Sequence, residues 1–184
     1  MKKLIIKTFV GFLFFCSLHG TAHSKFVNVK LETLSMIVGG TDVELDFYLG
    51  KLALGPAYYS LELELLSWKY EANMVGGQSS FHFNGADSDG WMITGKYVQG
   101  KFKFTYTSGG VAYTAEPDVS IIYGYFGYQW MWDNFNIQLK YGQSRYDTES
   151  TLTLTASDGS SLSKDLGSYS GTAGSFELRF GLAF

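Results

Sequence analysis

Apolar residues recur at every second position along most of the chain beyond residue 24, which is the pattern of β-strands with two unlike faces. We expect strands at 26–37, 41–49, 53–68, 91–98, 101–107, 119–130, 135–144 and 175–184. Tight connections near Gly50, Gly100 and Asp133 alternate with long, polar, Gly- and Ser-rich ones at 69–90, 108–118 and 145–174. The sequence therefore predicts an all-β chain with an even number of strands.

The two faces of these strands differ in charge. The uncharged face includes Ala57, Tyr59, Leu61, Leu63 and Leu65 in the third stretch, Phe102, Phe104 and Tyr106 in the fifth, and Val119, Ile121, Tyr123 and Tyr125 in the sixth. The opposite face carries the charged residues, namely Lys30, Glu32, Asp42, Glu44, Asp46, Glu62, Glu64, Lys96, Lys101, Lys103, Lys140, Glu177 and Arg179. Because a soluble antiparallel sheet also has a polar and an apolar face, the alternation alone leaves open which face points outward.

The last stretch alternates up to a terminal aromatic residue, with Phe176, Leu178, Phe180, Leu182 and Phe184 on one face. This pattern resembles the carboxy-terminal signature of bacterial outer-membrane β-barrels, which their assembly machinery recognises. Together with strands of roughly membrane-spanning length, it makes the chain similar to the small OmpA-type and OmpX-type barrels. The resemblance implies an eight-stranded antiparallel up-and-down transmembrane β-barrel, monomeric, with short periplasmic turns and longer extracellular loops.

In such a barrel the uncharged face must meet lipid, because an Arg or Lys facing the bilayer midplane costs about 2–4 kcal/mol. The interior of eight strands is just wide enough to be filled by side chains, so the charges would be enclosed there and paired. We expect a lumenal charge network of Lys30, Glu32, Glu44, Asp46, Glu62, Glu64, Lys96, Lys103, Lys140, Glu177 and Arg179. The alternative is a soluble exported barrel whose charges are solvated and whose interior holds an apolar ligand.

The first 24 residues have the features of a cleaved secretory signal. Met1-Lys2-Lys3 is positively charged, the stretch 9–18 is almost wholly apolar, and small residues precede a cleavage site after Ser24. We therefore expect residues 25–184 to form the barrel domain in the outer membrane of a Gram-negative bacterium. The lone cysteine, Cys16, lies within the signal, so cysteine chemistry is not expected. No basic cluster is present for a nucleic-acid partner.

Candidate chemistry beyond the signal centres on His82, which lies close to Asp87 and Ser88 in the expected loop 69–90. Small outer-membrane enzymes that trim or acylate lipid A use a histidine with a serine and an acid, because hydroxyl attack needs a base within hydrogen-bond reach. The His-x-Ser pattern of the deacylase type is absent, since Asn84 stands where the serine would be. These three residues are therefore weak catalytic candidates, and no metal or other cofactor is expected.

The main expectation is a non-enzymatic barrel that serves envelope integrity or surface interaction, such as adhesion, through its loops. The loop 145–174 contains alternating Thr and Leu residues and the turn pair Asp158-Gly159, which predicts an extracellular hairpin. Its exposed edge could bind a partner by strand addition, or it could be a passive solvated loop. The alternatives are a lipid-A-modifying enzyme and a pore for small solutes. Expected partners are outer-membrane lipid, lipopolysaccharide, the barrel assembly machinery and an extracellular ligand of the loops.

Overall fold

A computed structural model describes residues 25–148, 151–165 and 169–184 of the chain, so the expected signal peptide lies outside the described residues. The strands are β1 Val27–Glu32, β2 Gly40–Leu49, β3 Leu52–Leu65, β4 Trp68–His82, β5 Gly90–Ser108, β6 Val111–Ala115, β7 Asp118–Trp132, β8 Phe135–Thr148, β9 Thr151–Ala156, β10 Ser161–Asp165 and β11 Tyr169–Ala183. One short helix, α2 Thr33–Ile37, follows β1.

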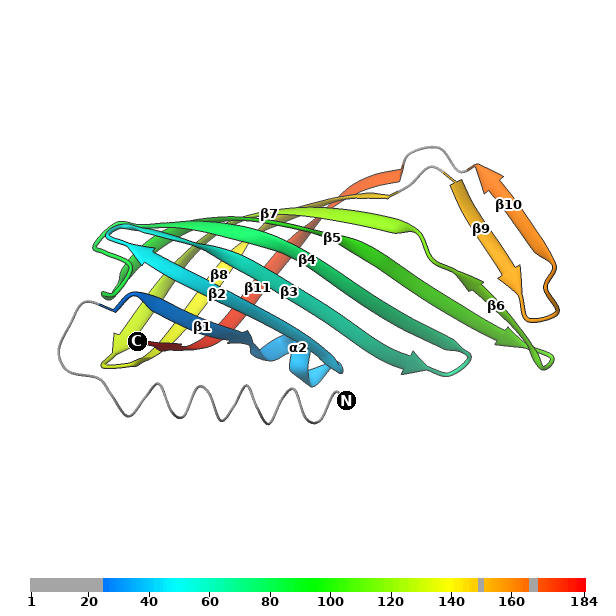
Figure 1. Cartoon of the computed structure of the whole chain (residues 1–184), viewed down its shortest axis with the longest axis horizontal. Coiled ribbons are helices and arrows are strands. Elements are labelled where there is room, and N and C mark those ends of the chain that lie inside the picture. Colours follow the sequence, from blue (N-terminus) through cyan, green and yellow to red (C-terminus); the bar gives the residue numbers. More distant parts are fainter. Residues whose placement is uncertain (1–24, 149–150, 166–168) are drawn as a thin grey trace.

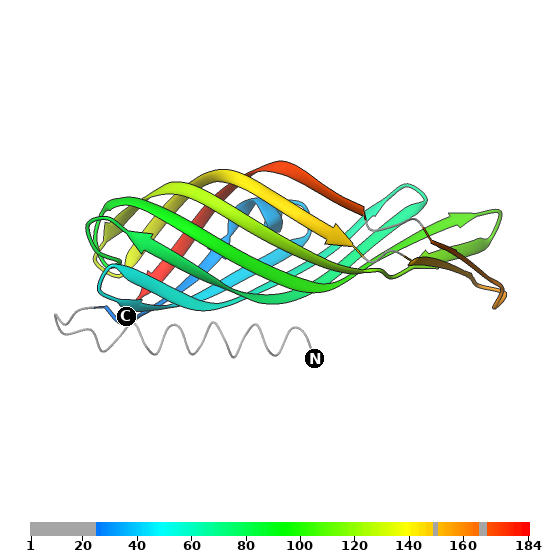
Figure 2. The ribbon, with the colours of Figure 1, turned by 90° about the horizontal axis from the view of Figure 1, so that it is seen from above.

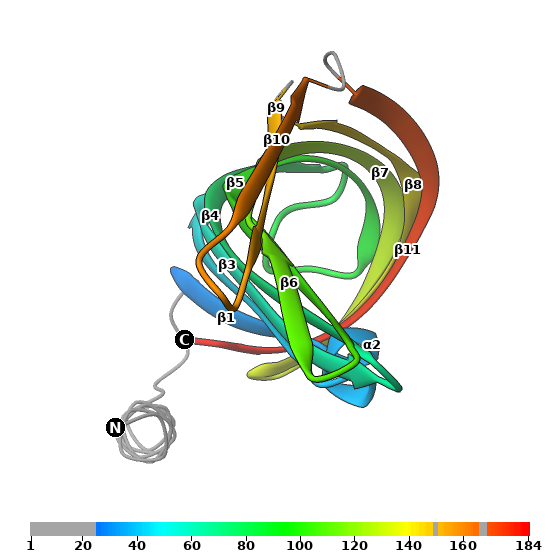
Figure 3. The same ribbon diagram turned by 90° about the vertical axis from the view of Figure 1, so that its right-hand side faces the viewer.

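Eight of the strands form a closed antiparallel barrel, which is the fold that the resemblance implies (Figures 1 and 3). The order around the ring is β1, β2, β3, β4, β5, β7, β8 and β11. The barrel closes where β11 pairs with β1, from Asn28 opposite Ala183 to Glu32 opposite Arg179. Closure removes the free edges that an open sheet of this length would carry.

The prediction was wrong in the region of β4 and β5. Residues 69–82, expected within a loop, belong to β4, and the expected strands 91–98 and 101–107 are one continuous strand, β5. Glycines explain both errors, because they resemble turn signals in the sequence. A Cβ atom at Gly76 would collide with the carbonyl oxygen of Tyr97, and one at Gly100 would collide with that of Asn73. These glycines therefore permit close approach of neighbouring strands and do not end them.

The first strand ends five residues earlier than predicted, because residues 33–37 form α2. The carboxylate of Glu32 caps the helix, accepting hydrogen bonds from the backbone N–H groups of Leu34 at 3.0 Å and Ser35 at 2.5 Å. The hydroxyl of Thr33 donates to the carbonyl oxygen of Leu178 on β11 at 2.7 Å. Glu32 therefore serves as a helix cap, and not as a partner in the lumenal charge network.

The two ends of the barrel are unlike. One end, called the turn end here, carries the connections 50–51, 83–89 and 133–134 together with Phe184. The connection 83–89 lies across the ring of strands (Figure 3). Its Ala86 is buried, and the side chain of Gln129 donates to the carbonyl oxygens of Ala86 at 2.9 Å and Ser88 at 3.1 Å. The turn end is therefore covered by its own longest connection.

The other end, called the loop end, extends into a small sheet beyond the barrel (Figures 1 and 2). β6 folds back on β5, and β9 pairs with β6 through Tyr113 opposite Ala156 and Thr114 opposite Thr155. β9 and β10 form a hairpin whose turn contains Gly159 at a φ of 87°. The hairpin itself is confirmed, while its attachment to β6 was not predicted.

Candidate functional site: the charged lumen and the divided outer wall

The outer wall changes character along single strands, and β3 shows the change most clearly. In its turn-end half, Leu54 and Tyr58 point outward and are exposed, while Ala57 points inward and is buried. In its loop-end half, Glu62 and Glu64 are the exposed outward residues. The strand keeps its regular alternation throughout, so the change is one of composition and not of orientation.

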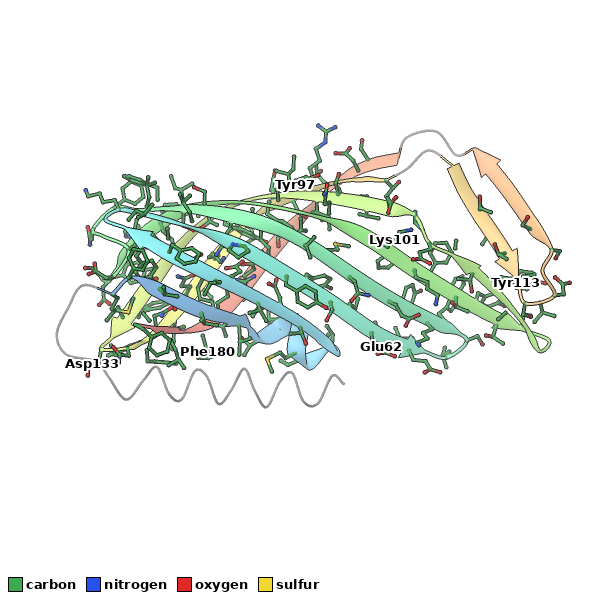
Figure 4. All side chains as sticks on the ribbon, in the orientation of Figure 1. Glu62, Tyr97, Lys101, Tyr113, Asp133 and Phe180 are labelled. Carbon is green, nitrogen blue, oxygen red and sulfur yellow. The ribbon has the colours of Figure 1, made fainter. Side chains whose placement is uncertain are left out.

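The turn-end half of the outer wall is an apolar band that runs around the barrel. Exposed residues of this band are Phe47, Leu49, Leu52, Leu54, Tyr58, Val75, Phe81, Trp91, Ile93, Tyr97, Ile122, Phe126, Trp130, Trp132, Phe135, Leu139, Tyr141, Phe176 and Leu182. Aromatic pairs reinforce it, with Trp91 stacked on Phe126 at 5.0 Å between ring centroids and Trp132 on Phe135 at 6.1 Å. Figure 4 shows Phe180 in this half of the barrel.

The loop-end half of the outer wall is charged, and here the prediction was wrong. Glu62, Glu64 and Lys103, expected in the lumen, lie on the outside together with Lys101. Figure 4 labels Glu62 and Lys101 in this half of the barrel. The prediction assumed that one face of each strand points outward and is uncharged along its whole length. The strands continue beyond the apolar band, where their outward positions are charged and their inward positions are apolar.

Ion pairs join neighbouring strands on this charged surface. Lys69 Nζ lies 3.3 Å from Glu62 Oε1 and 3.2 Å from Glu71 Oε1, and Lys103 Nζ lies 3.2 Å from Glu71 Oε2. Hydrogen bonds from Lys103 and Lys69 lower the pKa of the Glu71 carboxyl, and a hydrogen bond to Glu71 raises the pKa of Lys69. Both groups are therefore held in their charged forms.

The inner face of the loop-end half is apolar, which is the second part of the same correction. Residues expected to point outward lie inside, packed against the buried side chains of Ala57, Ala72, Met74 and Val98. They are Tyr59, Leu61, Phe102, Val119, Ile121 and Tyr123. Tyr125 lies two residues beyond Tyr123 on β7, toward the turn end. It is buried and also faces the lumen, where its hydroxyl donates to Glu177 Oε1 at 2.8 Å.

The lumen of the turn-end half holds a network of eight charged side chains, all buried. They are Lys30, Asp42, Glu44, Asp46, Lys96, Lys140, Glu177 and Arg179. Four are basic and four acidic, so their formal charges cancel. The sequence prediction grouped these residues by their shared face, and the structure brings their charged atoms together.

Arg179 on β11 is the centre of this network. Its Nη2 lies 2.8 Å from Asp42 Oδ2 and 3.0 Å from Glu44 Oε1, and its Nε lies 2.7 Å from Glu177 Oε2. Lys140 Nζ lies 2.6 Å from the same oxygen of Glu177. A guanidinium group can serve several carboxylates at once because its donors form a rigid planar fork.

The two remaining lysines extend the network toward opposite ends of the lumen. Lys30 Nζ lies 2.7 Å from Asp46 Oδ2 and 3.0 Å from Glu44 Oε2. Lys96 Nζ lies 2.9 Å from Asp42 Oδ2 and 3.2 Å from Glu44 Oε1. Each buried charge therefore has an opposite charge within ion-pair distance, as burial in a low-dielectric interior requires.

A layer of amide and hydroxyl side chains fills the lumen between the network and the turn end. Asn28 donates to the Tyr48 hydroxyl at 2.7 Å, and Asn136 donates to Asn28 Oδ1 at 3.0 Å. Gln138 donates to Gln129 Oε1 at 2.7 Å. These residues were not predicted to belong to the lumen because they are uncharged. The available signal was their spacing, since Asn28 precedes Lys30 by two positions and so shares its face.

The structure does not assemble His82, Asp87 and Ser88 into a catalytic group. His82 is 1% exposed at the end of β4 and faces the lumen, not the expected loop, with its ring 6.4 Å from that of Tyr48. Ser88 donates to Asp87 Oδ1 at 3.4 Å in the connection 83–89. Within the described residues, neither ring nitrogen of His82 has a hydrogen-bond partner.

In the part of the chain that the structure describes, no set of three or more His, Cys, Asp or Glu side chains is grouped to hold a metal ion. Among the same residues, no helix has the length and apolarity needed to cross a membrane. Comparisons with family models, with curated proteins and with solved structures find no match to this chain.

Proposed function

We propose that the protein is a non-enzymatic, monomeric β-barrel of the bacterial outer membrane that presents its loop-end sheet to partners outside the cell. The observation that carries this proposal is the division of the outer wall. Apolar side chains surround the turn-end half, where charges are sealed in the lumen, and charged side chains cover the loop-end half. A barrel that is half in lipid and half in water needs this division.

The charge network supports the proposal that lipid surrounds the turn-end half of the barrel. Enclosing eight charges without compensation would cost several kcal/mol per ion, yet the interior accepts them because each is paired. A soluble barrel would gain more by filling this interior with the leucines and phenylalanines that instead lie on its outer wall. In a bilayer this hydrophobic gain is no longer available, because hydrocarbon already keeps the apolar side chains on the outer wall out of water.

In this assignment the turn end faces the periplasm and the loop end faces outward. The exposed hairpin of β9 and β10 is well placed for recognition, because β10 lies at the end of the strand order and pairs only with β9 in the described sheet. A free strand edge can bind a partner by strand addition. The segment from Phe176 to Phe184, which includes the end of β11, is what the assembly machinery would recognise.

The test combines location with orientation. Cells expressing the full chain are fractionated, and the membrane fraction is run by electrophoresis with and without boiling; we expect outer-membrane recovery and a shift in migration on boiling. Protease added to intact cells should cleave near Ser157 and leave residues at the turn end intact. Recovery in a soluble fraction, or cleavage only after the cells are opened, would contradict the proposal.

A pore is separately testable, because the amide layer, the charge network and the connection 83–89 occupy the lumen. Purified protein in planar lipid bilayers should show no stepwise conductance. A reproducible unit conductance would show that ions pass through the lumen. The proposal of surface presentation would then give way to one of solute transport.

A further inference from the structure

A hollow of about 720 Å³ lies in the outer wall of the barrel, and four neighbouring strands, β4, β5, β7 and β8, contribute to its lining. It lies where β5 exchanges one partner for another. β5 pairs with β7 as far as Lys101 opposite Asp118, and from Phe104 onward it pairs with β6. The hollow is therefore placed at the base of the loop-end sheet.

The hollow crosses the boundary between the apolar band and the charged surface. Tyr97, Gln99 and Lys101 follow one another at outward positions of β5, and all three line the hollow. Figure 4 shows Tyr97 and Lys101 in this order from the turn end toward the loop end. The Tyr97 hydroxyl donates to Gln99 Oε1 at 2.9 Å. The lining thus changes from an aromatic ring, through a hydroxyl and an amide, to a charged group.

The loop-end side of the hollow carries two opposite charges, those of Lys101 and Asp118. These residues lie directly opposite each other on β5 and β7, and both are exposed. Among the described residues they form no ion pair with each other, and Lys101 Nζ lies 3.9 Å from Glu116 Oε1. The Cβ atoms of residues paired in this way are about 5 Å apart. One small group with a negative and a positive charge can therefore contact both side chains.

We propose that the hollow binds a phosphoethanolamine group carried by a lipid of the outer leaflet, an inference that rests on the proposed membrane location. The phosphate binds Lys101, and the primary ammonium group binds Asp118. Asp147, which lines the hollow from β8, is a second carboxylate within the site. A head group that is only anionic fits less well, because the described lining holds two carboxylates and a single lysine.

The turn-end side of the hollow favours a lipid over a soluble zwitterion. Val75 and Tyr97 line it, belong to the apolar band and are 59% and 43% exposed. Ile122 lies opposite Tyr97 on β7 and is also exposed. Acyl chains that pack along these side chains leave the head group level with Lys101. The outward-facing Ser120 lies between the two levels and can donate to an ester carbonyl oxygen of the lipid.

The test is native mass spectrometry of the full barrel, purified in detergent with EDTA, with added phosphatidylethanolamine, phosphatidylcholine or phosphatidylglycerol of identical chains. We expect one phosphatidylethanolamine per barrel, bound about threefold or more tightly than either other lipid. Choline has no N–H donor for Asp118, and the glycerol head has no positive charge. Free phosphoethanolamine at the same concentration should not displace the lipid. Equal affinity for the three lipids, or displacement by the free head group, would overturn the proposal.

Two variants each remove one charge from the hollow. Lys101→Met and Asp118→Asn should each weaken phosphatidylethanolamine binding by about threefold or more. Lys103→Met is the matched control, because Lys103 is the next outward lysine of β5 but pairs with Glu71 and does not line the hollow. It should bind the lipid as the wild type does, and the boiling shift confirms that each variant folds.

Unchanged affinity in both hollow variants, or an equal loss in Lys103→Met, would overturn the site. These outcomes are distinct from failure of the proposed function. Recovery of the protein in a soluble fraction would remove the membrane location itself. A barrel that is recovered in the outer membrane but does not discriminate between the lipids would overturn this inference alone.

Discussion

The guanidinium group of Arg179 binds both carboxylate oxygens of Asp42, with Nη1 3.2 Å from Oδ1 and Nη2 2.8 Å from Oδ2. Arg179 lies on β11 and Asp42 on β2, and β1 stands between these strands. The pair therefore bridges the seam at which the last strand meets the first, from inside the barrel. It joins residues 137 positions apart in the chain.

Removing the guanidinium group should destabilise the barrel strongly. Arg179→Met leaves Asp42, Glu44 and Glu177 short of a positive charge in a buried site, and loss of one partner from such a group costs about 3–5 kcal/mol. The measurement is urea unfolding of the refolded protein in vesicles. Arg145→Met is the control, because Arg145 pairs with Asp147 at 3.4 Å on the exposed surface. It should cost under about 1 kcal/mol, and equal losses would show that the network is not the main source of stability.

Gly100 on β5 should tolerate no side chain. Gly100→Ala directs a methyl group at the carbonyl oxygen of Asn73 on β4 and should cost about 1–3 kcal/mol through strand displacement. Gly95→Ala on the same strand is the control, because nothing lies within 4 Å of its Cβ position. On electrophoresis, the folded barrel and the boiled protein migrate differently. The temperature at which the band of the folded barrel is lost should fall for Gly100→Ala alone. A similar fall in both would mean that glycine acts through flexibility.

The ion pairs of Glu71 should contribute stability that depends on pH. Its carboxyl has a pKa below the usual 4.5, so its stabilisation is present above that value and is lost as the pH falls through the folded-state pKa. Glu71→Gln should therefore lower the free energy of unfolding at pH 7, by under about 1 kcal/mol because the site is exposed. The difference should shrink in acid.

The matched control for this pH dependence is Glu64→Gln. Glu64 also lies on the charged outer wall, but it forms no ion pair with the described residues. Unfolding at neutral and acidic pH should give the same free energy for this variant and the wild type. A Glu71→Gln difference that stayed constant down to strongly acidic pH would argue that the ion pairs are not its cause.

The hairpin of β9 and β10 should be dispensable for folding. β9 is attached to the rest of the described sheet by two residue pairs with β6, which is a small interface compared with any seam of the barrel. Replacing 151–165 by a short Gly-Ser linker should leave the boiling shift intact while abolishing binding to cell-surface partners. Loss of the boiling shift in this variant would mean that the loop-end sheet stabilises the folded barrel.

The alternation of residues by itself determined much of the lumen. Lys30, Glu44, Lys140 and Arg179 share the inward face of their strands because successive side chains point to opposite sides of a strand. The same rule misplaced Glu62, because it states which residues share a face and not whether that face points into the lumen or outward. It also missed β4, whose glycines resemble loop residues.

The local pattern thus predicts the fold class. It also predicts that many charged residues share one face of their strands and that a hairpin turns at Asp158-Gly159. Tertiary structure alone decided three other features: the register in which β11 pairs with β1, the change of the outer wall from apolar to charged along β3, and the position of His82 in the lumen apart from Asp87 and Ser88. The physical reason is the range of the forces involved. Alternation is set by neighbouring peptide units. Strand register, and the position of each strand along the barrel axis, depend instead on pairing between distant segments and on closure of the ring.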